Sequence, residues 1–355
     1  MRKLFLMLLA VFVVLLVGCS KDELSTSDNE TKENDRDGGK TVTETDEVVK
    51  ENENVFPLTG IGTDETVDNR IISVMINNHS AARPQSGLSE ADIVFEILAE
   101  GMITRLLAFY QSELPDVVGP VRSAREYYFE LANGYNALYV YHGAAGFVND
   151  MIKSRGINYL DGATYDNDGN LFKRESFRKA PHNSYLLLDA AYDVASGKGY
   201  ETKVSHEPME FLTDEDVQNL SGDAAEHVKI VYSNNPSWIV EYSYDETNGN
   251  YFRSSDGERT VELTSEDPVK IENIFIVETH HEVIDDVGRR AIDFETGGNG
   301  YLIQNGQAQE VQWENRDGRI VPVKDGQTVG FVPGKTWINV VPTNPGMQQS
   351  VTFSN

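Results

Sequence analysis

The chain has 355 residues, and 57 Asp and Glu against 30 Lys and Arg give it a formal net charge of −27. So acidic a protein is a poor candidate for binding nucleic acid or for docking on anionic lipid through its surface. Its one cysteine excludes an intramolecular disulfide and a metal site built from several cysteines.

The N-terminus predicts a lipoprotein signal peptide at residues 1–18. Basic residues at 2 and 3 precede an apolar run over 4–17, which is shorter than the roughly 20 residues of a membrane-spanning helix. The run ends in LVGC at 16–19, a pattern typical of cleavage before a lipid-carrying cysteine. We therefore expect lipid on Cys19 to hold the chain on the outer face of the cytoplasmic membrane in a Gram-positive type of envelope. A diderm periplasm is the alternative location, and an ordinary secretory signal with a chance cysteine is the alternative signal.

Residues 19–54 are predicted to form a disordered acidic tether. Positions 20–54 hold twelve Asp or Glu against five Lys or Arg and almost no aliphatic side chains. Such a segment buries too little apolar surface to offset its ordering entropy. A flexible coil of this length reaches roughly 30–35 Å, so the body would work at some height above the membrane.

The first block of the body, residues 55–201, is predicted to be an α/β (α+β) domain with a mixed sheet. Apolar, β-branched runs predict strands, and helical patterns with possible caps lie between them. Strands are expected at 70–77, 91–97, 105–110 and 137–142, and helices at 123–133, 147–154 and 184–196. Ser184 is a candidate N-cap of the last helix.

A polar linker, residues 202–225, contains a possible short helix at 213–220. The second block, residues 226–355, predicts a smaller β-rich C-terminal domain, because Asn-Gly and Asp-Gly pairs separate its apolar runs. Strands are expected at 228–232, 238–244, 250–253, 271–279, 300–304 and 336–341. An antiparallel sheet or a partial barrel fits this spacing.

Arginines recur at loop-like positions of the first block although the protein is acidic. They are Arg83, Arg105, Arg122, Arg125, Arg174 and Arg178. Two lie in GPVRSAR at 119–125; if Ser123 opened the helix, they would join free backbone N–H groups in a carboxylate or phosphate site. The alternative is that these arginines pair with Asp and Glu on the surface.

His182 and Asn183 follow Pro181 in a turn. A histidine there could act as a general base or proton donor, because its pKa lies near neutrality. Structural or ligand-binding roles are the alternatives.

The polar loop 77–87 follows the first predicted strand, where ligand sites are common in α/β sheets. No nucleotide loop or zinc motif is present, and TYDNDG at 164–169 departs from a calcium loop at its first position, so we expect no metal and no cofactor.

Several stretches together resemble the YerB-like lipoproteins of Gram-positive bacteria, a family of unknown function. They are ARPQSGL at 82–88, ADIVFE at 91–96, GPVRSAR at 119–125, Arg178 with APHN at 180–183, and PGKTWI at 333–338. The resemblance covers the body from about residue 56 to the end. It implies an N-terminal and a smaller C-terminal domain in a lipoprotein, and it implies no activity.

Three functions remain open from the sequence. The first is a wall-facing protein that binds an anionic or peptide-like ligand, such as a peptidoglycan fragment, through the Arg-rich motifs with His182 and Asn183. The second is an assembly lipoprotein that recruits envelope proteins through its β-rich domain. The third is a hydrolase in which His182 works with Glu100 or Asp161.

Overall fold

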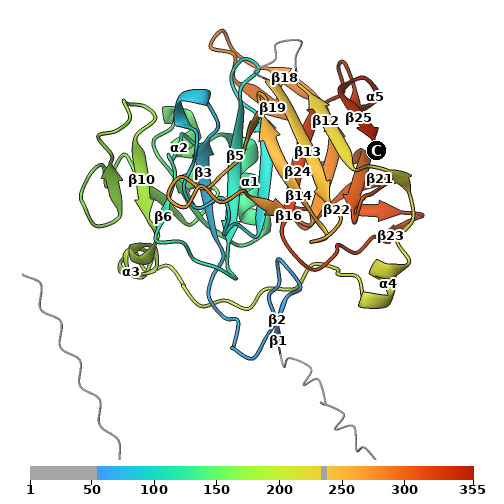
Figure 1. The fold of residues 1–355 in the computed structure, drawn as a ribbon. Coiled ribbons are helices and arrows are strands. Elements are labelled where there is room, and N and C mark those ends of the chain that lie inside the picture. Colours follow the sequence, from blue (N-terminus) through green and yellow to red (C-terminus); the bar gives the residue numbers. More distant parts are fainter. Residues whose placement is uncertain (1–53, 233–237) are drawn as a thin grey trace, which may run out of the picture. The chain divides into compact units, whose positions relative to one another are not determined.

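The computed structural model describes residues 54–232 and 238–355 (Figure 1). The predicted signal peptide, Cys19 and all but the last residue of the predicted tether lie outside these residues. Within the described ranges, no helix is both long and apolar enough to cross a membrane.

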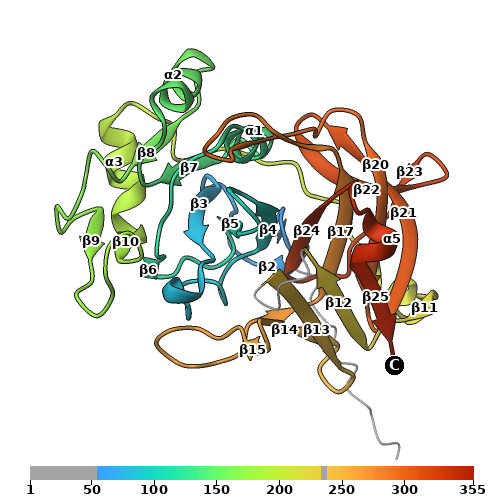
Figure 2. The ribbon, with the colours of Figure 1, turned by 90° about the horizontal axis from the view of Figure 1, so that it is seen from above.

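A mixed sheet of twelve strands forms the centre of the body. Along the sheet the strands are β23 (Gln327–Thr328), β22 (Arg319–Lys324), β21 (Gln307–Arg316), β20 (Gly298–Gln304), β17 (Asn273–Thr279), β24 (Thr336–Pro342), β4 (Ile93–Leu98), β5 (Thr104–Tyr110), β3 (Ile72–Asn77), β7 (Leu138–Tyr141) and β8 (Tyr159–Asp161), with β11 (Asp223–Ala224) paired to β21. β24 pairs in parallel with both β17 and β4, so strands from the two predicted blocks are continuous in one sheet (Figure 2).

The other strands form smaller sheets around the central one. One contains β15 (Glu258–Arg259), β14 (Asn250–Ser255), β13 (Ile239–Asp245), β12 (His227–Val231), β25 (Val351–Ser354) and β16 (Lys270–Ile271). Another contains β6 (Val117–Val118), β10 (Ser184–Leu187) and β9 (Phe172–Arg174). Two short pairs are β1 (Asn54–Val55) with β2 (Gly62–Thr63) and β18 (His281–Val283) with β19 (Arg290–Ile292).

The helices in the described residues are short. They are α1 (Glu126–Gly134), α2 (Gly146–Ser154), α3 (Ala191–Gly197), α4 (Asp214–Gln218) and α5 (Met347–Ser350), with 3₁₀ turns at Ser80–Ala82 and Leu188–Ala190. The mixed sheet of the prediction is confirmed, but the α/β description holds only loosely, because strands make up 41% of the structure and helices 14%. The neighbouring pairs β3–β5 and β4–β5 are antiparallel, and antiparallel strands do not need the helical crossover that joins parallel strands.

Two helix starts differ from the sequence prediction. Ser184 opens a strand, because residues 184–187 pair with β9 and β6, and the helical turns begin only at Leu188. α1 begins at Glu126, and the carbonyl of Ser123 accepts a hydrogen bond from Arg105 at 2.8 Å. The predicted carboxylate or phosphate site required Ser123 to open the helix. Because α1 begins three residues later, this part of the prediction is wrong. Strands β21 and β22 were not predicted.

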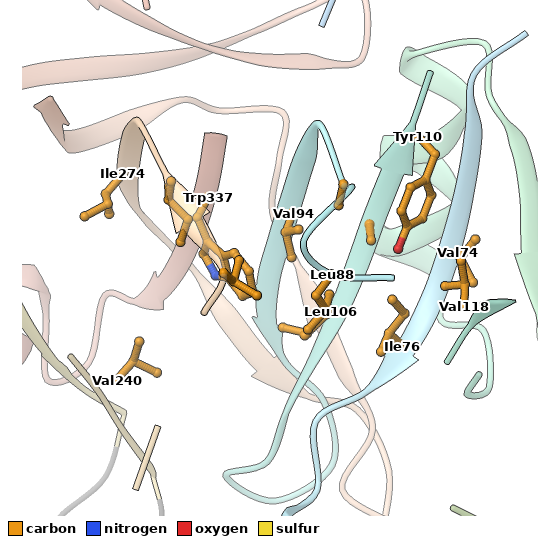
Figure 3. Packing of buried hydrophobic residues seen from close by; sticks show 14 of the residues in the cluster. Val74, Ile76, Leu88, Val94, Leu106, Tyr110, Val118, Val240, Ile274 and Trp337 are labelled. Atoms are coloured by element: carbon orange, nitrogen blue, oxygen red, sulfur yellow. The ribbon is translucent and has the colours of Figure 1, made fainter. Parts of the chain in front are cut away.

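Both faces of the central strands are buried, and this explains their nearly unbroken apolar sequences. On one face Val74 and Leu106 join a cluster that includes Val240 of β13 and Trp337 of β24 (Figure 3). On the other face alternate residues such as Phe109 pack against helix α1. A sheet covered on both sides is a rigid support for the loops at its strand ends.

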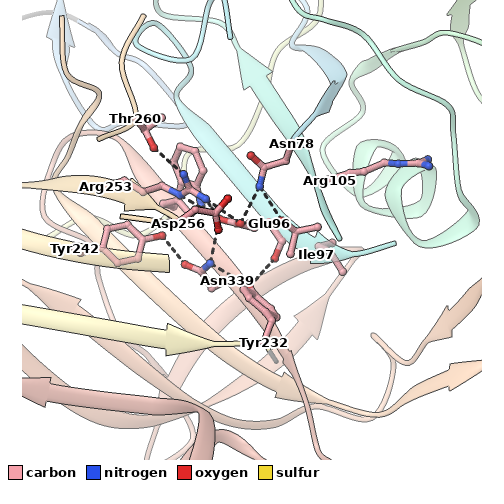
Figure 4. Close-up of polar contacts among 12 residues, drawn as sticks. Asn78, Glu96, Ile97, Arg105, Tyr232, Tyr242, Arg253, Asp256, Thr260 and Asn339 are labelled. Atoms are coloured by element: carbon pink, nitrogen blue, oxygen red, sulfur yellow. Dashed lines mark hydrogen bonds and ion pairs between the residues drawn. The ribbon is translucent and has the colours of Figure 1, made fainter. Parts of the chain in front are cut away.

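A buried ion pair joins β4 to the second sheet. The Arg253 guanidinium on β14 lies 2.9 Å from the Glu96 carboxylate on β4, and their side chains are 1% and 0% exposed (Figure 4). Trp337 Nε1 and Thr104 Oγ1 also donate to this carboxylate, at 3.0 and 2.9 Å. Arg253 Nη1 donates to Thr260 Oγ1 at 2.7 Å. The charges are therefore compensated inside the protein and not by solvent.

His206, in the segment between the two blocks, should make stability depend on pH. Burial lowers its pKa to about 4, with Arg319 and Arg70 adding to the shift, whereas the ordinary value is 6.5. As pH falls below 6.5 the unfolded chain takes up the proton first, so stability is complete above pH 6.5 and is lost as pH falls toward 4. From 1.36 kcal/mol per pKa unit, we expect this histidine to account for a loss of about 2 kcal/mol between pH 7.5 and pH 5.

Urea unfolding at both pH values checks this expectation. In His206→Gln the loss on acidification should be about 2 kcal/mol smaller than in the parent chain. His227→Gln, at an exposed histidine, is the control. Its free energy of unfolding should decrease on acidification by as much as that of the parent chain. An identical loss in His206→Gln and the parent chain would show that the burial of this ring does not set the pH dependence.

Candidate functional site

Three loops that the sequence singled out meet at the end of β3. They span residues 77–87, 119–125 and 178–183. Backbone hydrogen bonds join these loops or their borders: Asn77 N to Pro120 O (2.8 Å), Ser86 N to Gly119 O (2.8 Å) and Val121 N to Ser184 O (2.7 Å). Motifs far apart in the sequence thus share one surface, which we call the loop cluster.

Asn77 holds His182 in a defined orientation within the loop cluster. The side-chain oxygen of Asn77 accepts the backbone N–H of His79 at 3.0 Å, so its amide nitrogen faces His182. That nitrogen lies 2.9 Å from His182 Nδ1, which therefore accepts and leaves the ring proton on Nε2. Burial lowers the pKa of His182, and His79, Arg122 and Arg178 lower it further. At neutral pH this ring is a neutral Nε2–H donor.

The guanidinium of Arg122 has no partner among the residues that the structure describes. Its backbone is fixed, since its N–H donates to Met75 O at 2.8 Å and its carbonyl accepts from His142 N at 2.9 Å. Its guanidinium forms no hydrogen bond or ion pair with any residue in 54–232 or 238–355. Burial and the charge of Arg125 lower the pKa of Arg122, with Glu100 acting in the opposite direction. Five N–H donors therefore remain available to a ligand.

Arg105 and Arg125 share a single carboxylate instead. Glu100 accepts from Arg105 Nη2 at 2.7 Å and from Arg125 Nε at 2.6 Å. Burial alone would raise the pKa of Glu100, but the two guanidinium groups bring it below its ordinary value. One carboxylate between two arginines leaves a net positive charge beside Arg122.

The other candidate residues are tied to protein groups. Arg83 pairs with Asp256 at 2.5 Å and donates to Asn78 O at 2.8 Å. Arg178 donates to Tyr185 Oη and to Pro84 O, both at 2.5 Å. Asn183 accepts from Arg174 Nη1 at 2.9 Å, and Arg174 also pairs with Asp166. Arg174 and Asn183 thus brace the β9–β10 loop, which carries His182 and Arg178.

The ring of His182 has no acid partner in the part of the chain that the structure describes. Among the described residues no carboxylate lies within hydrogen-bond or ion-pair distance of its ring, which contacts Asn77. Glu100 is engaged by two arginines, and Asp161 accepts the backbone N–H groups of Gly143 and Ala163 at 2.8 and 2.9 Å. The histidine–carboxylate pair that a hydrolase would use is therefore not formed with either predicted acid. In the same residues no group of three or more His, Cys, Asp or Glu is arranged around a metal position.

Two residues of the loop cluster, Asn77 and His79, were predicted only as part of the polar loop 77–87 and not as individual site residues. Asn77 orients His182, and the ring of His79 lies 4.8 Å from that of His182. Both lie in the polar loop after β3, so their position at a strand end was the available signal. Their contact with a residue more than a hundred positions later left no trace in the sequence.

The described residues thus form a two-block β-rich body with a cationic loop cluster, and its family is shown by comparison. Residues 58–201 match the protein of unknown function (DUF3048) N-terminal domain, and residues 228–338 match the C-terminal domain of the same family. The chain belongs to this family, and the predicted resemblance is confirmed.

Its similarity to one named relative is close. The chain is 48% identical over 288 residues to the protein named Putative lipoprotein YerB of Bacillus subtilis (strain 168), covering 81% of this chain and 86% of the relative. The crystal structure of the YerB protein from Bacillus subtilis aligns with a TM-score of 0.78 and 45% identity, covering 85% of this chain and 100% of that one. Neither name specifies a ligand or a reaction.

Proposed function

We propose that this chain is a membrane-anchored extracytoplasmic lipoprotein that binds an anionic or peptide-like ligand of the cell envelope at its loop cluster. The name of the Bacillus subtilis relative and the LVGC pattern ending in Cys19 support the lipid anchor. The acidic segment between Cys19 and the body would keep the loop cluster at some distance from the lipid surface.

The unpartnered guanidinium of Arg122 is the observation that carries the binding proposal. A partly buried cation without a counter-ion is costly, and an anionic ligand would remove that cost. The neutral His182 ring adds an Nε2–H donor beside it, and the net positive charge of Arg105, Arg125 and Glu100 adds long-range attraction. A carboxylate is the simplest group that matches two N–H donors of a guanidinium.

Arg83, Arg105, Arg125, Arg174, Arg178 and Asn183 then have a supporting part. Their partners within the protein fix the loops that present Arg122 and His182. Arg178 remains a direct ligand candidate as well, because it lies in the same β9–β10 loop as His182.

Titration of the full chain with muropeptides tests this proposal. Arg122→Ala should weaken binding about tenfold to a hundredfold, since a hydrogen bond to a charged group is worth about 1.5–3 kcal/mol. Its melting temperature should stay close to that of the parent chain, because the guanidinium holds no other described residue in place. Arg316→Ala, at an exposed arginine paired with Glu314, is the control and should bind like the parent.

An assembly role makes the opposite prediction for the same variant. If the arginine motifs serve only to hold the fold together, Arg122→Ala lowers the melting temperature and no muropeptide binds the parent chain at millimolar concentration. That pair of results would overturn the binding proposal in favour of an assembly protein.

A further inference from the structure

A hollow of about 810 Å³ opens next to the loop cluster and has the opposite charge. Four separate segments line it, within residues 86–90, 113–117, 175–185 and 262–264. Among the described residues that line it there is no lysine or arginine. Its charged lining residues are Glu90, Glu113, Asp116, Glu175 and Glu262.

Three of these carboxylates form no ion pair with a described residue. Glu113 pairs with Lys335 and Glu175 with Lys173, at 3.0 and 2.8 Å. Glu90 and Glu262 accept from Ser89 Oγ, and Glu90, Asp116 and Glu262 form no ion pair with any residue that the structure describes. The hollow therefore has more carboxylates than the described cations at its edge can balance, which are Lys335, Lys173 and the Arg178 guanidinium that contacts Tyr185 and Phe177.

Glu262 is fixed in place by the protein backbone. Its two oxygens accept the N–H of Gly87 at 3.0 and 2.9 Å, and the next residue, Leu263, donates its N–H to Gln85 O at 2.9 Å. Burial raises the pKa of Glu262, and the nearby charge of Glu90 raises it further. Burial and the charge of Glu90 both disfavour the ionised form of the Glu262 carboxylate, and a cation nearby would stabilise that form.

The remaining wall is apolar and aromatic, and this feature is independent of the carboxylates. Phe177 is 58% exposed and Leu114 is 40% exposed, so both present apolar surface at the hollow. Tyr185 lines the same wall, and its hydroxyl is held by Arg178. Concave sites with apolar walls and a few placed polar groups are typical of ligand sites.

We propose that this hollow binds a cationic group of a peptide-like ligand, such as a lysine side chain next to an apolar residue. The amine would lie among Glu90, Asp116 and Glu262, and the apolar neighbour would contact Phe177 and Leu114. Anions are repelled by these carboxylates, so the site is separate from the anion surface at Arg122. The inference does not depend on whether Arg122 binds a ligand.

The test uses the full chain in nanodiscs of zwitterionic lipid and two tetrapeptides, blocked at both ends. One peptide has the sequence Phe-Lys-Leu-Lys, and the other has norleucine in place of both lysines. Calorimetry should show that the lysine peptide binds at least tenfold more tightly and loses affinity as salt is raised. The double variant Glu90→Gln with Asp116→Asn should bind the lysine peptide about tenfold more weakly.

The double variant Glu282→Gln with Asp286→Asn removes the same charge from the β18–β19 hairpin and should bind like the parent chain. Phe177→Ala, at an exposed side chain, should weaken binding of the lysine peptide while the chain stays folded. Three results would each overturn the proposal: no binding of the lysine peptide at millimolar concentration, equal binding of the norleucine peptide, or unchanged affinity in the Glu90 and Asp116 double variant.

Discussion

Arg253→Ala is expected to lower the free energy of unfolding by about 3–5 kcal/mol, the usual cost of removing one partner of a buried ion pair. The substitution leaves the Glu96 carboxylate at 0% exposure without its cation. The remaining donors, Trp337, Thr104, Asn78 and Asn339, are all neutral. They satisfy lone pairs but do not balance the charge.

Urea unfolding of the full chain at neutral pH measures this loss. Arg316→Ala is the matched control, because Arg316 pairs with Glu314 at 42% and 48% exposure, and it should cost at most about 1 kcal/mol. A double variant, Glu96→Gln with Arg253→Met, should recover part of the loss, since it leaves no unpaired buried charge. A loss below about 1 kcal/mol in Arg253→Ala would show that water reaches Glu96 in the folded protein.

The position of this ion pair shows what sequence patterns could and could not predict. The stretch at 91–96 was identified as a strand with a distinctive motif, and it forms β4. However, Arg253 lies 157 positions from Glu96, and nothing local marks either residue as the other's partner. Non-local pairing also decides the order of the sheet, in which β24, near the end of the chain, lies between β17 and β4.

Local patterns were reliable where local forces dominate. The apolar runs of β3, β4 and β5 were predicted because burial on both faces requires them. Residues 184–187 were predicted as helix from their flanking signals, but pairing with β9 and β6 outweighed that preference. Strand β21 was missed although its buried and exposed residues alternate over much of its length.

In the candidate site, too, local sequence patterns predicted some features, and contacts between distant residues decided the others. Arginines in loops of an acidic protein were recognisable from the sequence, and three of the motifs do meet in the loop cluster. Which arginines are neutralised depends on partners such as Glu100 and Asp256, and these partners could not be inferred from spacing. The structure therefore separates Arg122 from the arginines that support the loops.

Gly134→Ala is expected to destabilise the protein by about 3 kcal/mol, although alanine is the better helix former. Gly134 ends helix α1 against the turn between β21 and β22. An added Cβ would lie 2.6 Å from the Cα of Gly318 and closer still to its carbonyl group, which is backbone and cannot rotate away. Gly318 belongs to one of the Asp-Gly pairs that predicted turns, Asp317-Gly318. Its φ is +87°, and the absence of a side chain also allows the close approach of Gly134.

Gly197→Ala is the matched control, because Gly197 also ends a helix, α3, and nothing lies within 4 Å of its added Cβ. It should leave stability unchanged or raise it by up to about 1 kcal/mol. Gly318→Ala should be costly as well, and the double variant with Gly134→Ala should lose less than the two single losses combined, since both disrupt one contact. Equal stability of Gly134→Ala and Gly197→Ala would mean that α1 can move away from the β21–β22 turn without loss, and that this contact does not fix the helix on the sheet.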